Sequence, residues 1–174
     1  KKNFRKKKIT NLFIFPELFI TGYPPEDLVL NPRFVQDNLA AIREIIEYTK
    51  DIAVVVGFVN QDSQLYNAAA IAADGQLVGI YHKIILPNYG VFDEDRYFRS
   101  GAKSPVYVIN ETPVGVNICE DIWYPEPIAK QKSQGAQLVI NINGSPYSMR
   151  KHEFRRRLLS TRAAENDITI CYAN

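Results

Sequence analysis

The sequence predicts a layered α/β domain in which helices cover one face of a sheet. Apolar, β-branched runs alternate with segments of helical periodicity, in the order β-α-β-β and then β-β-α-β-α-β. Two of the runs flank Asp74-Gly75, a pair typical of a β-hairpin turn. The chain has 174 residues, 46% of them hydrophobic and 23% charged, which suits one globular domain with its own core.

The elements follow from local patterns. The segments with strand character are residues 10–15, 51–60, 65–73, 76–83, 105–110, 112–118, 137–143 and 168–174. The segments with helical spacing are residues 31–50, 125–134 and 151–167, the last of them expected to be a long amphipathic helix. Asn31-Pro32 is a favourable N-cap and N1 pair for the first helix, and Gly135 suits the end of the second. Residues 84–104 form a long irregular segment, which in a compact domain is usually functional.

Charge gives little reason to expect nucleic acid as a partner. The formal net charge is only +2. The basic cluster at 1–8, KKNFRKKK, is compatible with a nucleic-acid arm or a targeting tail, but we interpret it as a solvated helix end or frayed terminus. A second cluster, 150–157, falls in a helical pattern and is expected to be mostly a solvated face. No apolar run approaches the roughly 20 residues that span a bilayer, and no secretory signal is recognisable, so we expect no membrane partner.

The cysteines indicate a reducing setting. Cys119 and Cys171 cannot form a disulfide framework, and no CxxC pattern suggests a metal. His82 and His152 have no ligand-like spacing to other residues. We therefore expect a cytoplasmic protein without a metal site, in which Cys171 is a buried structural thiol.

Three reactive side chains come just after expected strands, where active sites of α/β folds gather. They are Glu17, Lys83 and Cys119. Each alone has an ordinary explanation: a solvated loop charge, a surface lysine or an inert buried thiol. Together they provide a thiol nucleophile, an ammonium group that can hold an oxyanion, and a carboxylate that can move a proton. Such a set is sufficient for amide hydrolysis without histidine.

The segments FPELFITGYP, HKIILPNYGVFDE and NICEDIWYP closely resemble the signature regions of the nitrilase, or carbon–nitrogen hydrolase, superfamily. This resemblance implies a four-layer αββα sandwich. It makes Glu17 the general base, Lys83 the oxyanion-stabilising cation and Cys119 the nucleophile. It also makes Glu94, in VFDE, a second glutamate that supports the lysine.

Within this superfamily, FITGYPPEDL, LPNYGVFDE, CEDIWYP and NGSPYSMRKHEFR look like the glutaminase domains of glutamine-dependent NAD⁺ synthetases, from about residue 10 to the end. The resemblance implies release of ammonia from L-glutamine to a C-terminal synthetase domain, which amidates adenylated nicotinic acid adenine dinucleotide. We expect no cofactor for residues 1–174, because they contain no phosphate-cradling loop. ATP and Mg²⁺ are expected only in the synthetase domain.

The same resemblance assigns further positions to glutamine binding or to the pocket wall, namely Tyr89, Ser145, Lys151, Tyr23, Phe92, Glu120 and Trp123. The ordinary alternatives are core packing for the aromatic residues, turn chemistry for Ser145 and a solvated basic face for Lys151. Free glutamine carries an α-ammonium and an α-carboxylate group. Glu94 or Glu120 could pair with the first, and Lys151 with the second.

Two departures from the superfamily pattern concern the ends. Its members carry a strand and a long helix before the FPEL strand and several strands after YAN, so we expect residues 1–174 to be an incomplete glutaminase domain of a longer chain, with exposed sheet edges. We also expect a homo-oligomer.

Two other interpretations stay open: a stand-alone nitrilase-type amidase that acts on another small amide, and a catalytically inactive scaffold. The sequences of the LPNYGVFDE and NGSPYSMRK segments argue against a stand-alone amidase. The joint presence of the three reactive side chains argues against an inactive scaffold.

Overall fold

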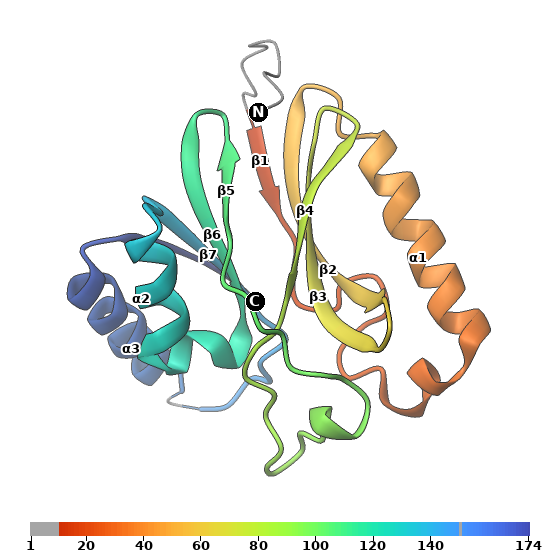
Figure 1. The fold of residues 1–174 in the computed structure, drawn as a ribbon. Coiled ribbons are helices and arrows are strands. Elements are labelled where there is room, and N and C mark those ends of the chain that lie inside the picture. The colour runs from red at the N-terminus through yellow and green to blue at the C-terminus, as the bar shows by residue number, and fades with distance from the viewer. Residues whose placement is uncertain (1–10, 150) are drawn as a thin grey trace.

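The computed structural model describes residues 11–149 and 151–174, so the basic cluster at 1–8 lies outside the described residues. Two four-stranded sheets pack face to face (Figure 1). The first, sheet A, contains in spatial order β1 (Asn11–Ile14), β2 (Ile52–Gln61), β3 (Leu65–Ala73) and β4 (Gln76–His82). The second, sheet B, contains β5 (Val106–Ile109), β6 (Thr112–Ile118), β7 (Leu138–Ile142) and β8 (Thr169–Ala173).

Helices cover the outer face of each sheet and complete four layers. Helix α1 (Pro32–Glu47) lies on sheet A, whereas α2 (Pro125–Ser133) and α3 (Lys151–Asn166) lie on sheet B (Figure 1). The expected αββα sandwich is therefore confirmed. Periodicity alone predicted helices on one face of one sheet, because strand patterns do not reveal that two sheets face each other.

Within each sheet, the strands are arranged in the order in which they occur in the chain. The β2–β3 and β3–β4 pairs and the β5–β6 pair are antiparallel, and the hairpin at Asp74-Gly75 is present. The β1–β2, β6–β7 and β7–β8 pairs are parallel. The Asn31 side chain accepts a hydrogen bond from Arg33 N and caps α1, as the sequence predicts. Three short 3₁₀ segments complete the elements: Glu26–Leu30, Glu94–Arg96 and Cys119–Trp123.

The main core lies between the two sheets. Its buried members alternate along the strands, so that one face of each strand points to the opposite sheet; they include Val55, Ile71, Val116, Ile118, Ile140 and Ile142. A second cluster, on the other face of β2 and β3, packs against α1. Both faces of these two strands are therefore buried, which explains their nearly continuous apolar sequence.

Helix α3 forms where the sequence predicts it, but none of its side chains is fully buried. Leu159 is the member of α3 that joins the cluster between sheet B and its helices, and it is only partly buried. The expected amphipathic character is thus weak, because charged and polar residues occupy most of the helix. Within 11–149 and 151–174, no helix has both the length and the apolar character needed to cross a membrane.

Candidate active site

The three reactive side chains meet where the strands end. Glu17 follows β1 and Lys83 follows β4, both in sheet A, whereas Cys119 follows β6 in sheet B. Gly57 in β2 allows the Glu17 loop to lie directly on the sheet, because a Cβ atom there would come within 2.3 Å of Pro16 O and 2.4 Å of Leu18 N. The sandwich therefore brings together groups that are distant in sequence.

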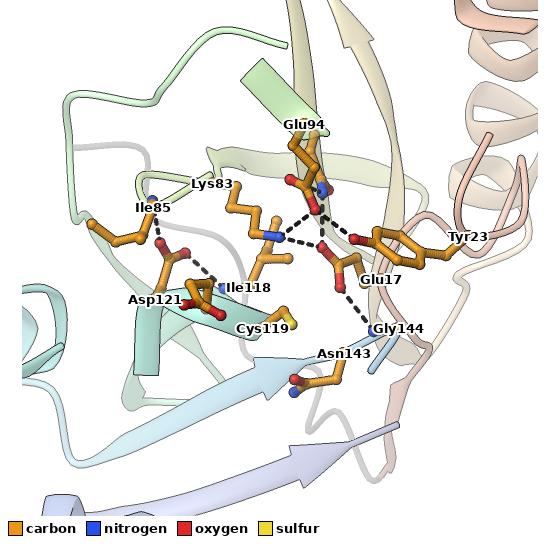
Figure 2. Close-up of polar contacts among 12 residues, drawn as sticks. Glu17, Tyr23, Lys83, Ile85, Glu94, Ile118, Cys119, Asp121, Asn143 and Gly144 are labelled. Carbon is orange, nitrogen blue, oxygen red and sulfur yellow. Dashed lines mark hydrogen bonds and ion pairs between the residues drawn. The ribbon is translucent and has the colours of Figure 1, made fainter. Parts of the chain in front are cut away.

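Lys83 lies at the centre of a buried charged cluster (Figure 2). Its Nζ is 2.7 Å from Glu17 Oε1 and 2.8 Å from Glu94 Oε1. Burial alone would lower the pKa of Lys83, but the two carboxylates outweigh burial and hold this pKa well above its ordinary value. Burial, opposed by Lys83, raises the pKa of Glu94. Lys83 is therefore an ammonium ion, and two of its three N–H donors are engaged.

The two oxygens of Glu17 have different surroundings. Oε1 accepts hydrogen bonds from Lys83 Nζ and, at 2.8 Å, from Asn67 Nδ2. Oε2 accepts one from the backbone N–H of Gly144, at 2.8 Å. Since a carboxylate oxygen has two lone pairs, Oε2 keeps one for a proton. Oε2 is thus the atom of Glu17 that is free to act as a base.

Cys119 is the first residue of a 3₁₀ turn and has a φ of +44°, in the left-handed region that non-glycine residues rarely adopt. Its Sγ lies 3.4 Å from Ser145 Oγ, and its side chain is almost fully buried. Burial first, and then the charge of Glu17, raise the pKa of Cys119 well above its ordinary value, although Lys83 opposes them. These surroundings therefore disfavour the thiolate form of Cys119.

Asp121 joins the turn at Cys119 to the end of β4. Its Oδ2 accepts hydrogen bonds from Ile118 N at 2.9 Å and Tyr81 Oη at 2.8 Å. Its Oδ1 accepts from Ile84 N at 3.0 Å and Ile85 N at 2.8 Å (Figure 2). Burial raises the pKa of Asp121 to about 6, against the lowering effect of these donors. One carboxylate therefore fixes the turn at Cys119 relative to the residues on both sides of Lys83.

An aromatic wall and a second carboxylate lie beside this cluster. Tyr23 Oη donates to Glu94 Oε1 at 2.8 Å, and Tyr89 Oη lies 3.0 Å from both carboxylate oxygens of Glu120. The ring of Phe92 is near both tyrosines, with centroid distances of 6.3 and 5.6 Å. Tyr23, Phe92 and Glu94 line a cavity of about 310 Å³ together with other residues of 23–27 and 91–98, but Lys83, Cys119 and Glu120 do not line it.

The remaining predicted positions differ in their surroundings. Ser145 lies against the thiol, as described, and Lys151 is exposed at the first position of α3. The ring of Trp123 packs on Phe154, with centroids 5.4 Å apart, in the cluster between sheet B and its helices. Cys171 is half-buried rather than buried, because β8 forms the edge of sheet B among the described strands. The expectation of a buried thiol there was wrong.

Sequence reasoning missed three groups of the site. Asn67 and Asp121 are fully buried polar side chains, and Gly144 N holds Glu17. A signal existed for the first two: Asn67 interrupts the apolar run LYNAAAIAA, and Asp121 follows Cys119 by two positions. Buried polar residues must find partners, so each deserved a candidate role.

A buried Glu–Lys–Cys arrangement on an αββα sandwich defines the class of carbon–nitrogen hydrolases. The sequence profile of that family, described as carbon-nitrogen hydrolase, matches residues 4–174, and the chain belongs to this family. The predicted membership of the superfamily is confirmed, and the protein is an enzyme of this type.

The similar curated proteins are glutamine-dependent NAD(+) synthetases. That of Thermotoga maritima is 44% identical over 169 residues, which cover 95% of this chain and 29% of the relative. That of Aquifex aeolicus is 43% identical over 168 residues, covering 95% of this chain and 30% of the relative. The chain thus spans less than a third of the length of these relatives.

Solved structures agree. Glutamine-dependent NAD⁺ synthetase from Acinetobacter baumannii, in complex with adenosine diphosphate, superposes with a TM-score of 0.87 and 40% identity, covering 93% of this chain and 31% of that one. An amidase of the nitrilase superfamily from Nesterenkonia has a TM-score of 0.80 and 28% identity, covering 94% of this chain and 62% of that one. A variant of that amidase in which glutamate is replaced by leucine shows covalent addition of the acetamide moiety of fluoroacetamide at the active site cysteine.

Proposed function

We propose that this chain hydrolyses the side-chain amide of L-glutamine to glutamate and ammonia through a thioester on Cys119. The observation that carries the proposal is the buried Glu17–Lys83 pair, at 2.7 Å, next to a neutral thiol in the 3₁₀ turn after β6. The similarity to glutamine-dependent NAD⁺ synthetases over 95% of the chain supports glutamine as the substrate.

Acylation begins when Cys119 Sγ attacks the amide carbon while Glu17 Oε2 takes the thiol proton. Lys83 uses its third N–H, which neither glutamate engages, to stabilise the oxyanion, together with a backbone amide near residue 120. The C–N bond then breaks as Glu17 returns its proton to the leaving nitrogen. The products of this half-reaction are ammonia and a γ-glutamyl thioester.

Deacylation repeats the proton transfer with water. Glu17 Oε2 takes a proton from a water molecule as its oxygen attacks the thioester carbon. The C–S bond breaks, glutamate leaves, and the thiol is restored when Glu17 gives up that proton. In both half-reactions Glu17 acts first as a base and then as an acid, so it ends in its starting state. The net reaction consumes one water molecule per amide, because water attacks the thioester.

The α-ammonium and α-carboxylate groups of glutamine each need an oppositely charged side chain to bind them. Glu94 already accepts hydrogen bonds from Lys83, Tyr23 and Asn67, so of the two candidate carboxylates Glu120 is available for the α-ammonium group. Tyr89 Oη contacts both carboxylate oxygens of Glu120 and orients this side chain. Lys151 is the candidate for the α-carboxylate, and Ser145, beside the thiol, contacts the reacting amide.

In a longer protein of the kind that these relatives represent, the ammonia would pass to a C-terminal NAD⁺ synthetase domain that uses ATP and Mg²⁺. The present site requires no cofactor for the hydrolysis itself, because its own residues supply the nucleophile, the base and the oxyanion donor.

The similarity to the Nesterenkonia amidase favours one second candidate, an amidase that acts on another small amide. A panel of L-glutamine, L-asparagine, propionamide and butyramide, assayed for ammonia release with the full-length protein, separates the two. The glutaminase proposal predicts preference for L-glutamine by about 100-fold or more in kcat/KM, because a simple amide leaves the charged partners unpaired. Equal use of butyramide would support the amidase instead.

A further inference from the structure

Asn67, the third residue of the apolar strand β3, has its side chain fully buried and directed at the charged cluster. Its Nδ2 donates to Glu17 Oε1 at 2.8 Å and to Glu94 Oε2 at 3.2 Å. It thus joins two carboxylates that would otherwise repel each other across Lys83. We propose that Asn67 is a positioning residue for the hydrolysis, holding both glutamates in the orientation that leaves one Lys83 donor and one Glu17 lone pair for the reaction.

The unpartnered oxygen of Asn67 supports a role beyond stability. Among the described residues its Oδ1 has no hydrogen-bond partner, although it is buried. Such an atom costs about 1–3 kcal/mol of stability. Turning the amide over would not relieve this cost, because Oδ1 would then face the glutamate oxygens. The two carboxylates therefore fix the amide orientation, and an apolar residue would avoid the cost altogether.

The main chain of the same residue holds the third member of the cluster. Asn67 O accepts a hydrogen bond from Lys83 N at 2.9 Å, just beyond the end of β4. One residue therefore contacts Glu17, Glu94 and Lys83. The neighbouring Ala68, Ala69 and Ala70 are also buried, and of these four side chains only that of Asn67 carries a polar group.

The amide acts on the reaction through the groups it holds. Because Asn67 and Lys83 share Glu17 Oε1, the remaining basic position of Glu17 is on Oε2, next to Gly144 and the Cys119 side of the site. Without the amide, the carboxylates are free to turn, and Glu17 can offer either oxygen to Lys83. A displacement of about 1 Å at a reacting group lowers rates by about 100-fold.

The test compares Asn67→Asp and Asn67→Ala with matched changes at Asn38 in the full-length protein. Asn38 is also a buried asparagine, but it bonds to Val59 N and O and not to the cluster, so Asn38→Asp and Asn38→Ala report the cost of losing a buried amide. Each variant is assayed for thermal stability, for kcat and KM with L-glutamine, and for the pH dependence of Cys119 alkylation by iodoacetamide, followed by mass spectrometry.

We expect both Asn67 variants to lower kcat by about 100-fold with little change in KM, beyond any loss of folded protein. In Asn67→Asp the added negative charge also disfavours the Cys119 thiolate, so alkylation moves to higher pH by about one pH unit. The Asn38 variants lose stability but keep the kcat and the alkylation profile of the original protein. If Asn67→Asp does not fold, Asn67→Ala carries the kcat test.

The inference rests on the catalytic roles proposed above, and the two readouts separate their failures. A folded Asn67 variant with the original kcat and alkylation profile overturns the role of Asn67. If the folded original protein releases no ammonia from L-glutamine, the glutaminase proposal is overturned, and this result is independent of any Asn67 variant.

Discussion

At the residue scale, the proposed chemistry depends on one hydrogen-bond donor of Lys83 and one lone pair of Glu17 that other residues do not occupy. Lys83 keeps one N–H after its bonds to Glu17 and Glu94, and Glu17 keeps one lone pair on Oε2. The Cys119 thiol lies beside this pair (Figure 2), and burial raises its pKa. In the proposed mechanism, Glu17 therefore removes the thiol proton when an amide is in place.

Glu17→Gln should separate turnover from thiol reactivity. Glutamine hydrolysis should fall by about 10²–10⁴-fold, because no group moves the proton to the leaving nitrogen. Alkylation by iodoacetamide should persist, because iodide leaves without a proton and loss of the Glu17 charge favours the thiolate beside Lys83. Ammonia release and intact-mass measurement check the two halves. Full glutaminase activity in this variant would remove Glu17 from the mechanism.

Glu120→Gln and Lys151→Ala should act on binding. Each removes a charge proposed to pair with one end of glutamine, so KM should rise by about 10-fold or more, with alkylation by neutral iodoacetamide unchanged. Exposed Glu126 and Lys130 in α2 provide the matched controls, Glu126→Gln and Lys130→Ala. An unchanged KM in Lys151→Ala would leave Lys151 as part of a solvated basic face.

The sequence indicated Glu17, Lys83 and Cys119, to which the proposed mechanism gives the chemistry, but not the residues that hold them in place. Glu17, Lys83 and Cys119 each follow a strand, and position after a strand is a local signal. The side chain of Asn67 bonds to residues that are 27 and 50 positions away in the sequence. Asp121 bonds to residues that are 36 to 40 positions away, and to the nearby Ile118. Such pairings depend on how the sheets stack, which no local pattern specifies.

At the element scale, the close approach of the Glu17 loop to β2 positions the base. Gly57→Ala should push this loop away, because the added Cβ would meet backbone atoms of Pro16 and Leu18 that cannot rotate aside. We expect loss of stability and a fall in glutaminase activity of about 100-fold per folded molecule. Gly79→Ala is the control: its Cβ would meet the Tyr107 ring, away from the cluster, so stability should fall while kcat is retained. Equal kcat losses in both would contradict the positional argument.

The buried Asp121 carboxyl group should make the folding stability depend on pH. Burial raises the pKa of Asp121 from 3.8 to about 6, so between these values the folded state binds more protons than the unfolded state. Its contribution to stability therefore falls as pH rises from about 4 to about 6 and is constant above that. Asp121→Asn lacks this dependence and adds a constant penalty, because its NH₂ group faces N–H donors.

Denaturant unfolding of the original protein and Asp121→Asn across this pH range measures the difference directly. The stability advantage of the original protein over Asp121→Asn should shrink as pH rises. An advantage that grows with pH would mean that the four hydrogen bonds outweigh burial.

At the scale of the whole molecule, the site exists only when the two sheets are packed together. Glu17, Asn67 and Lys83 belong to sheet A, whereas Cys119, Gly144 and Ser145 belong to sheet B or to the loops that leave it. The core between the sheets, with Val55, Ile71, Val116 and Ile140 among its members, is therefore also what keeps base and nucleophile together. The alternation of strands and helices predicted the elements, but the sandwich itself was implied only by family resemblance.

The central claim is that Cys119 is the nucleophile of a glutamine-hydrolysing site. The most direct test is mass spectrometry of the full-length protein after incubation with 6-diazo-5-oxo-L-norleucine, an electrophilic glutamine analogue. The account predicts one adduct, on Cys119, prevented by excess L-glutamine and absent in Cys119→Ser, with the other free thiol, Cys171, unlabelled. Labelling of Cys171, no labelling at all, or labelling of Cys119 that L-glutamine does not prevent would contradict it.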